Sequence, residues 1–326
     1  MPIFDQGYRH WQGHLSGRSW RWWTITRRGA LLQLKNRWVI MAILAAWAPA
    51  ISLAALLFVW ALFEQRSTFL GPFLAMISRA LPGEIGTDPA AFRTTVWTFA
   101  FSAFFQLEVF FSMILVVLVG PDLISQDLRF GAIPLYFSKP LRRIDYFLGK
   151  LGVIGAYLTV AAIGPALLAY FFGVCFSLDL RVLMATLPIL WGSLAYGAVL
   201  VVSAGTLMLA MSSLSRNSRH VGALWIGLWL VSGILSEVLS ESFAEDWCVL
   251  VSYTRNLHRL RHFFLDTASA WDQIGSLLSV GRSNSDPSMF VGDPHPWTWS
   301  AAVLTGWFGL SLWILSLRVK SLDKLT

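Results

Sequence analysis

Six long apolar stretches dominate this chain, at residues 38–63, 95–119, 148–176, 182–211, 221–239 and 297–317. A helix needs about 20 apolar residues to cross the hydrocarbon core of a bilayer. The first four stretches exceed that length. The fifth is shorter and contains Gly222, Gly227 and Gly233, and the sixth is rich in tryptophan. The sequence therefore predicts an all-α membrane protein with six transmembrane helices.

Composition supports this class. Of the 326 residues, 56% are hydrophobic and 13% are charged, whereas soluble domains carry about 25% charged residues. The 17 tryptophans suit membrane interfaces, and the net charge of +7 suits basic residues held on the cytoplasmic side. No nucleic-acid-binding module accompanies the basic charge, so nucleic acid is not an expected partner.

The distribution of basic residues predicts the orientation. With the N-terminus in the cytoplasm, 17 of the 25 lysines and arginines fall in cytoplasmic segments, as the positive-inside rule requires. The prediction is a multi-pass protein of the cytoplasmic membrane with both termini in the cytoplasm.

Residues 1–37 form a cytoplasmic segment rich in arginine and tryptophan. From about Ser19 its pattern predicts an amphipathic helix in the lipid headgroup layer. A twin-arginine export signal at Arg27-Arg28 is disfavoured, because the apolar run that follows is too long for a signal peptide. Residues 38–326 are then one membrane domain.

The longest outer loop covers about residues 240–296, and its role is open. It is expected to contain a helix over residues 252–271, followed by a part rich in glycine, serine, aspartate and proline. Cys175 and Cys248 both fall on the outer side, where a single disulfide and two free thiols are both open alternatives.

Enzyme signatures are missing from the sequence. Gly149-Lys150 has Ile144 where a phosphate-binding loop needs glycine, and no serine or threonine follows. His258 and His262 stand one helical turn apart, but two ligands in an arginine-rich helix favour an amphipathic interfacial helix over a metal site. No catalytic residue, metal or cofactor is therefore expected on this chain.

Two polar residues interrupt the second apolar stretch, Gln106 and Glu108. A carboxyl group within the bilayer is costly and usually faces a partner helix or a polar cavity. Glu108 is expected to hydrogen-bond a neighbouring helix or subunit. The alternative is that the two side chains line a substrate or proton path.

Charge, aromatic residues and turn residues concentrate between the second and third apolar stretches, at residues 121–150. After Gly120-Pro121, a short helix is predicted over residues 122–130, and Gly131 and Pro134 are expected to end it. The helix carries Asp122, Gln126, Asp127 and Arg129, and a basic return loop follows with Lys139, Arg142 and Arg143.

This segment carries a family resemblance. The matching residues are, in order, Ile124, Asp127, Gly131, Ala132, Ile133, Ser138-Lys139-Pro140, Arg142-Arg143, Tyr146 and Leu148-Gly149-Lys150. The arrangement resembles that of the ABC-2 type transporter permeases, with Asp127 in place of the usual glutamate and Ala132 in place of the usual threonine. The link at residues 212–217, SSLSRN, is similar to the corresponding loop of that family.

The resemblance implies that ATP hydrolysis and substrate passage belong to different subunits. In ABC-2 permeases this cytoplasmic loop forms a coupling helix that docks on a separate ATPase subunit, which binds ATP and magnesium. Asp122, Gln126, Asp127, Arg129 and Gly131 would then serve coupling to the ATPase, and a second permease copy or a paralogue would complete a dimer. The expected function is a permease subunit, with export as the expected direction and the substrate open.

Two other functions remain as alternatives. One is a polytopic membrane enzyme acting on a lipid-linked substrate, which needs acid, base or metal groups at one membrane face. The other is a membrane anchor or sensor without transport. Co-purification with an ATPase distinguishes the permease from both.

Overall fold

The computed structural model describes residues 20–66, 71, 76, 85, 88–137, 141–177, 180–243, 246–279 and 296–323. Over these ranges the chain forms helices and no strand. Six of the described helical segments are long and apolar enough to cross a membrane: Arg37–Glu64, Pro89–Arg129, Arg143–Ser177, Arg181–Leu214, Ser218–Phe243 and Trp297–Arg318. They contain the six predicted stretches, so the prediction of a helical fold with six helices long and apolar enough to cross a membrane is confirmed for the described residues.

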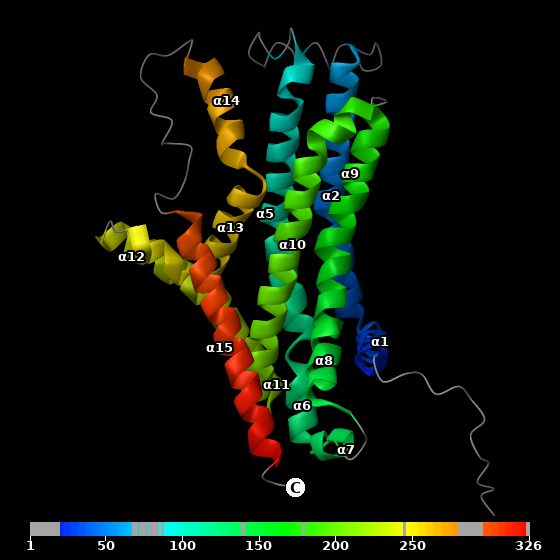
Figure 1. Cartoon of the computed structure of the whole chain (residues 1–326), viewed down its shortest axis with the longest axis vertical. Helices are drawn as coiled ribbons and strands as arrows, with labels where there is room; N and C mark the ends of the chain where they lie inside the picture. The colour runs from blue at the N-terminus through cyan, green and yellow to red at the C-terminus, as the bar shows by residue number, and fades with distance from the viewer. Residues whose placement is uncertain are drawn as a thin grey trace, which may run out of the picture.

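The first four spans form the centre of the molecule. Helix α2 (Arg37–Glu64), α5 (Arg93–Val119, preceded by η2, Pro89–Phe92), α9 (Gly164–Ser177) and α10 (Leu180–Leu214) pack against one another, side by side in Figure 1. Aromatic side chains pack between these helices, where Trp97 and Phe101 of α5 contact Tyr170 of α9. The sixth span, α15 (Trp297–Asp323), packs obliquely along α10.

The third span changes its helical pitch in mid-course. Helix α8 (Arg143–Leu158) passes through a π turn, η3 (Thr159–Ile163), into α9. In a π turn each carbonyl accepts from the N–H five residues later. For the Val160 carbonyl that residue is Pro165, which has no N–H to donate. The Trp47 indole of α2 donates to that carbonyl at 3.1 Å. A neighbouring span therefore satisfies the backbone group that the proline leaves open.

The fifth span is also interrupted. It consists of α11 (Ser218–Ile226), a π turn, η4 (Gly227–Val231), and α12 (Ser232–Phe243). The interruption begins at Gly227, one of the glycines that marked this span in the sequence. Beyond it α12 leans away from the central helices (Figure 1).

The N-terminal helix α1 (Arg21–Gln33) is fixed on the third span. Two glycines of α8 allow the close approach, because a Cβ at Gly149 would lie 2.7 Å from Ile25 and a Cβ at Gly152 would meet Thr26. The Thr26 hydroxyl donates to the Gly149 carbonyl at 3.0 Å, and the Tyr157 hydroxyl donates to the Ala30 carbonyl at 2.6 Å. Helix α1 is therefore bound to α8 by hydrogen bonds as well as by packing.

The segment before the sixth span, predicted to be an outer loop, differs from its predicted secondary structure. The single helix expected over residues 252–271 is two helices, α13 (Tyr253–Phe264) and α14 (Thr267–Ser279), after a 3-10 turn, η5 (Asp246–Val251). The break lies at Asp266, whose φ of 48° is incompatible with a continuous helix. Cys175 and Cys248 are both free thiols, the first exposed and the second buried.

Helix α13 is not a peripheral interfacial helix as expected. It packs against α5, α10 and α15, and Figure 1 places it beside the middle of α5 and α10 rather than at their ends. Sequence amphipathicity alone does not distinguish an interfacial helix from one with a buried apolar face.

We predict that Gly152→Val separates α1 from α8. The added side chain meets Thr26, and overpacking of this kind costs about 1–3 kcal/mol, measured as a lower melting temperature of the detergent-purified chain. The control is Gly155→Ala on the same helix, whose Cβ would lie 3.6 Å from Val201, an ordinary contact. Equal melting temperatures for the two variants would contradict the tight α1–α8 contact.

Candidate functional site

The segment predicted at residues 122–130 forms a short helix, α6 (Asp122–Arg129), directly after α5. The turn between the two helices lies against α10, where a Cβ added at Gly120 would meet the Met208 side chain. Gly120 therefore allows α10 to approach the bend at which α6 begins.

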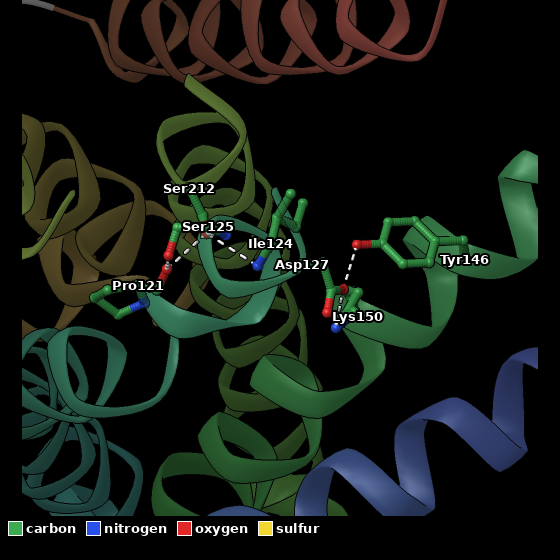
Figure 2. Close-up of polar contacts among 7 residues, drawn as sticks. All are labelled: Pro121, Ile124, Ser125, Asp127, Tyr146, Lys150 and Ser212. Atoms are coloured by element: carbon green, nitrogen blue, oxygen red, sulfur yellow. Dashed lines mark hydrogen bonds and ion pairs between the residues drawn. The ribbon is translucent and has the colours of Figure 1, made fainter. Parts of the chain in front are cut away.

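A serine from the fourth span caps the start of α6. Pro121 is the N-cap residue and provides no side-chain hydrogen bond, so the first N–H groups of the helix need other acceptors. The Ser212 hydroxyl oxygen of α10 accepts from the backbone N–H groups of Ile124 and Ser125, both at 3.1 Å. The same hydroxyl donates to the Pro121 carbonyl at 2.8 Å (Figure 2).

An ion pair joins the end of α6 to the third span. The Asp127 carboxylate accepts from the Tyr146 hydroxyl at 2.6 Å and lies 2.6 Å from the Lys150 ammonium, both on α8 (Figure 2). The side chains of Lys150 and Asp127 are only 12% and 14% exposed. Burial and the Asp127 charge raise the pKa of Tyr136, whose ring lies 5.9 Å from the Lys150 ammonium. This arrangement fixes α6 to α8.

Gly131 ends α6 with a φ of 63°, a conformation that glycine adopts without steric cost. The Ala132 N–H donates back to the Asp127 carbonyl at 2.9 Å. Pro134 was expected to help end the helix, and this expectation is wrong. It lies in the first turn of another short helix, α7 (Ile133–Phe137), where its missing N–H costs no helical hydrogen bond.

The opposite face of this segment is open to its surroundings. Gln126 and Arg129 are exposed, and Phe130 and Leu135 are 74% and 70% exposed. The Arg129 guanidinium lies 5.6 Å from the centre of the Phe130 ring. We call these four residues, Gln126, Arg129, Phe130 and Leu135, the outward face of the α6–α7 segment.

A pocket of about 400 Å³ lies between α1, α6 and α8. Asp122 and Gln126 of α6 contribute to its lining, with Arg28 on the α1 side. Asp122, predicted to serve coupling to the ATPase, is half-buried beside α1, whereas Gln126, which also lines this pocket, is exposed.

The structure separates the residues predicted for coupling. Gln126 and Arg129 point outward and Gly131 ends the helix, whereas Asp127 is engaged within the chain by α8. In the return loop Arg142 and Arg143 are exposed at the start of α8, and the Arg142 N–H donates to the Asp145 carboxylate at 3.3 Å. Lys139 lies outside the described residues.

Sequence reasoning missed the role of Ser212 and the pairing of Asp127 with Lys150. Both Ser212 and Lys150 belong to segments that matched the family resemblance, but nothing in a single sequence indicates which side chains meet across 23 or more residues. The exposure of Phe130 was also not predicted, because an aromatic residue at a helix end more often packs inward.

Gln106 and Glu108 lie on different faces of α5. Gln106 is exposed and Glu108 is fully buried. Neither Glu108 oxygen has a hydrogen-bond partner among the described residues, so the expected bond to a neighbouring helix is not found there. The two residues therefore do not line one common surface.

Comparison with known proteins leaves the resemblance as a sequence-based hypothesis, because neither a protein-family model nor a curated protein matches this chain.

We predict that Ser212→Ala destabilises the attachment of α6. Loss of the hydroxyl leaves two buried N–H groups at the helix start without an acceptor, and loss of a capping group costs about 1 kcal/mol. The measurement is the melting temperature. Ser213→Ala is the matched control, because the buried Ser213 hydroxyl donates within its own helix, to the Ala210 carbonyl. A Ser213→Ala loss equal to that of Ser212→Ala would contradict the cross-helix cap.

We also predict that Asp127→Asn lowers stability by about 2 kcal/mol, because the Lys150 ammonium then lacks its counter-charge in a largely buried position. Lys150→Met in the Asp127→Asn background recovers part of the loss. Thermal melting of the four proteins of this cycle measures the coupling. Asp122→Asn is the control, since its carboxylate has no ion-pair partner among the described residues, and additive effects at 127 and 150 would argue against the pair.

Proposed function

We propose that this chain is the membrane subunit of an ABC transporter of the ABC-2 permease type. It moves a substrate across the cytoplasmic membrane, outward as the resemblance implies, and uses ATP hydrolysed by a separate ATPase subunit. One observation carries the proposal: α6 is attached to two spans by its inner face while the α6–α7 segment presents an outward face. This is the geometry that a helix needs to pass force from a docked protein into the membrane domain.

The attachments give the proposal a mechanical basis. Displacement of α6 acts on α10 through the Ser212 hydrogen bonds and on α8 through the Asp127–Lys150 ion pair. Helix α1 moves with α8, because its Thr26 and Ala30 are hydrogen-bonded to that helix. A push at one point therefore reaches the third and fourth spans together, with α1 as part of the moving unit.

The outward face supplies the docking contacts in this proposal. Phe130 and Leu135 offer apolar area for a pocket on the ATPase subunit, and Arg129 with Gln126 supplies polar contacts around it. Buried aromatic side chains flanked by arginine are typical of the residues that dominate binding energy at protein interfaces. In this proposal Asp127 does not contact the ATPase subunit. It passes the movement of α6 to α8 through its ion pair with Lys150.

The remaining assignments follow from the same proposal. The α6–α7 end faces the cytoplasm with both termini, α1 lies in the headgroup layer with its tryptophans toward lipid, and residues 1–37 precede the membrane domain of residues 38–326. ATP and magnesium belong to the ATPase subunit. A second permease copy or a paralogue completes the transporter, and lipid or that second copy covers the exposed apolar side of α2, which includes Leu44 and Ile51.

We predict that an ATPase subunit co-purifies with the tagged chain from its native membrane and that Phe130→Ala lowers its recovery at least tenfold. Asp127→Asn leaves recovery close to that of the unaltered chain, because Asp127 belongs to the inner attachment. Ile144→Ala is the control, since Ile144 is 68% exposed but lies at the start of α8. Quantitative mass spectrometry of the purified sample measures the result. Wild-type recovery with Phe130→Ala, or a wild-type sample without any ATPase, would overturn the docking assignment.

A further inference from the structure

The pocket between α1, α6 and α8 combines apolar surface with charges of both signs. Its volume of about 400 Å³ lies within the range of about 300–1,000 Å³ that is typical of small-molecule sites. Part of its lining is apolar and includes Ile25, Leu32 and Val153. The lining also contains two basic and two acidic side chains, which are Arg28, Lys150, Asp122 and Asp127. The formal charge of the pocket is therefore zero.

Two of these four charges are already paired within the chain. The Asp127 carboxylate lies 2.6 Å from the Lys150 ammonium and accepts from the Tyr146 hydroxyl. By contrast, the side chains of Arg28 and Asp122 have no hydrogen-bond or ion-pair partner among the described residues. The pocket thus presents one cation and one anion to a ligand.

The cation and the anion belong to different helices. Arg28 lies on α1, one helical turn after Thr24, which also lines the pocket, so the two side chains share a face of that helix. Asp122 lies in the first turn of α6, where the helix dipole favours a negative charge. Over the described ranges no hydrogen bond or ion pair joins α1 to α6 directly. A ligand in this pocket lies between the two helices and contacts both charges.

These charges select a class of ligand. An arginine guanidinium binds phosphate through two parallel hydrogen bonds, and a carboxylate accepts hydrogen bonds from an ammonium group. A simple anion would satisfy Arg28 but would be repelled by Asp122. A quaternary ammonium has no N–H to donate to the Asp122 carboxylate. The lining therefore fits a group that carries both a phosphate and a primary ammonium, which is the chemistry of phosphoethanolamine.

The surroundings of the pocket indicate that this group belongs to a lipid. Leu32, which lines the pocket, is 64% exposed, and Trp20, Trp23 and Leu31 of the same segment are exposed as well. Exposed apolar side chains beside basic ones are typical of a helix in the headgroup layer. A lipid offers acyl chains to these side chains, whereas a soluble phosphoethanolamine does not. The choice of a lipid rests on the proposed placement of α1 in that layer, but it does not depend on an ATPase subunit.

We propose that the pocket between α1, α6 and α8 binds the headgroup of phosphatidylethanolamine. Its phosphate accepts hydrogen bonds from Arg28 and Thr24, and its ammonium donates to Asp122. The bound headgroup joins α1 to α6, which lack a direct polar contact in the described part of the chain. Helix α6 then has a third attachment, in addition to those through Ser212 and Asp127.

The experiment uses the full chain, purified in detergent, stripped of lipid and free of any ATPase subunit. Native mass spectrometry measures the binding of phosphatidylethanolamine, phosphatidylcholine and phosphatidylglycerol with identical acyl chains. We expect phosphatidylethanolamine to bind about tenfold more tightly than either of the others, the effect of one hydrogen bond between charged groups. Glycerophosphoethanolamine, which has the headgroup without acyl chains, is expected to bind about tenfold more weakly than the lipid, because it buries less apolar surface.

Single variants test the two contacts. Arg28→Gln and Asp122→Asn are each expected to weaken phosphatidylethanolamine binding about tenfold. Arg27→Gln and Asp272→Asn are the matched controls, because both residues are exposed and lie outside the pocket lining, and they leave binding unchanged. Phosphatidylethanolamine also raises the melting temperature of the unaltered chain but not that of Asp122→Asn, whereas the two proteins melt alike without lipid.

The outcomes separate the claims. Equal binding of the three lipids, or tighter binding of phosphatidylglycerol, overturns the site for a zwitterionic headgroup. Glycerophosphoethanolamine binding as tight as that of the lipid overturns the lipid as its source. A loss with Arg27→Gln equal to that with Arg28→Gln overturns the assignment to this pocket. Selective lipid binding by a chain that recovers no ATPase from its native membrane upholds the lipid site and contradicts the proposed transport function.

Discussion

The need to satisfy backbone polar groups without water governs this structure. In the hydrocarbon core an unpaired N–H or C=O costs several kcal/mol, and a helix solves the problem within its own segment. At two places where a helix of this chain bends or begins beside another span, a side chain of that span completes the hydrogen bonding. Trp47 does so for Val160 at the π turn of the third span, and Ser212 does so for the start of α6.

These cross-helix bonds require close approach, and glycine makes that approach possible. Gly149 and Gly152 bring α1 onto α8, and Gly120 brings Met208 of α10 against the bend before α6. The same contacts that shorten the distance between helices also tie them into one mechanical unit. The polar end of the molecule is therefore a set of connected helices, and the outward face of the α6–α7 segment is directed away from them.

The interior contains buried polar side chains that no neighbouring group in the described part of the chain satisfies. Glu108, Arg261 and several other buried side chains have polar atoms without a hydrogen-bond partner among the described residues, although the core is largely apolar. Such unpartnered buried groups reduce stability.

The sequence predicted those features that depend on neighbours along the chain. Length and hydropathy identified the six spans, and Gly131 marked the end of α6, because a turn with positive φ is a local requirement. The same local reasoning failed for residues 252–271, where the break at Asp266 carries no glycine or proline signal, and for Pro134, which begins a helix rather than ending one.

Tertiary structure decided what depends on contacts between spans. The inward direction of Asp127, the cap supplied by Ser212 and the burial of α13 depend on which helices lie together, and a single sequence does not specify that. An apolar span packs with similar energy against many neighbours, since lipid is as apolar as another helix. The sequence by itself thus determined six helices long and apolar enough to cross a membrane, with a charged loop between the second and the third. Only the packing of those helices decided which face of the loop is held and which is exposed.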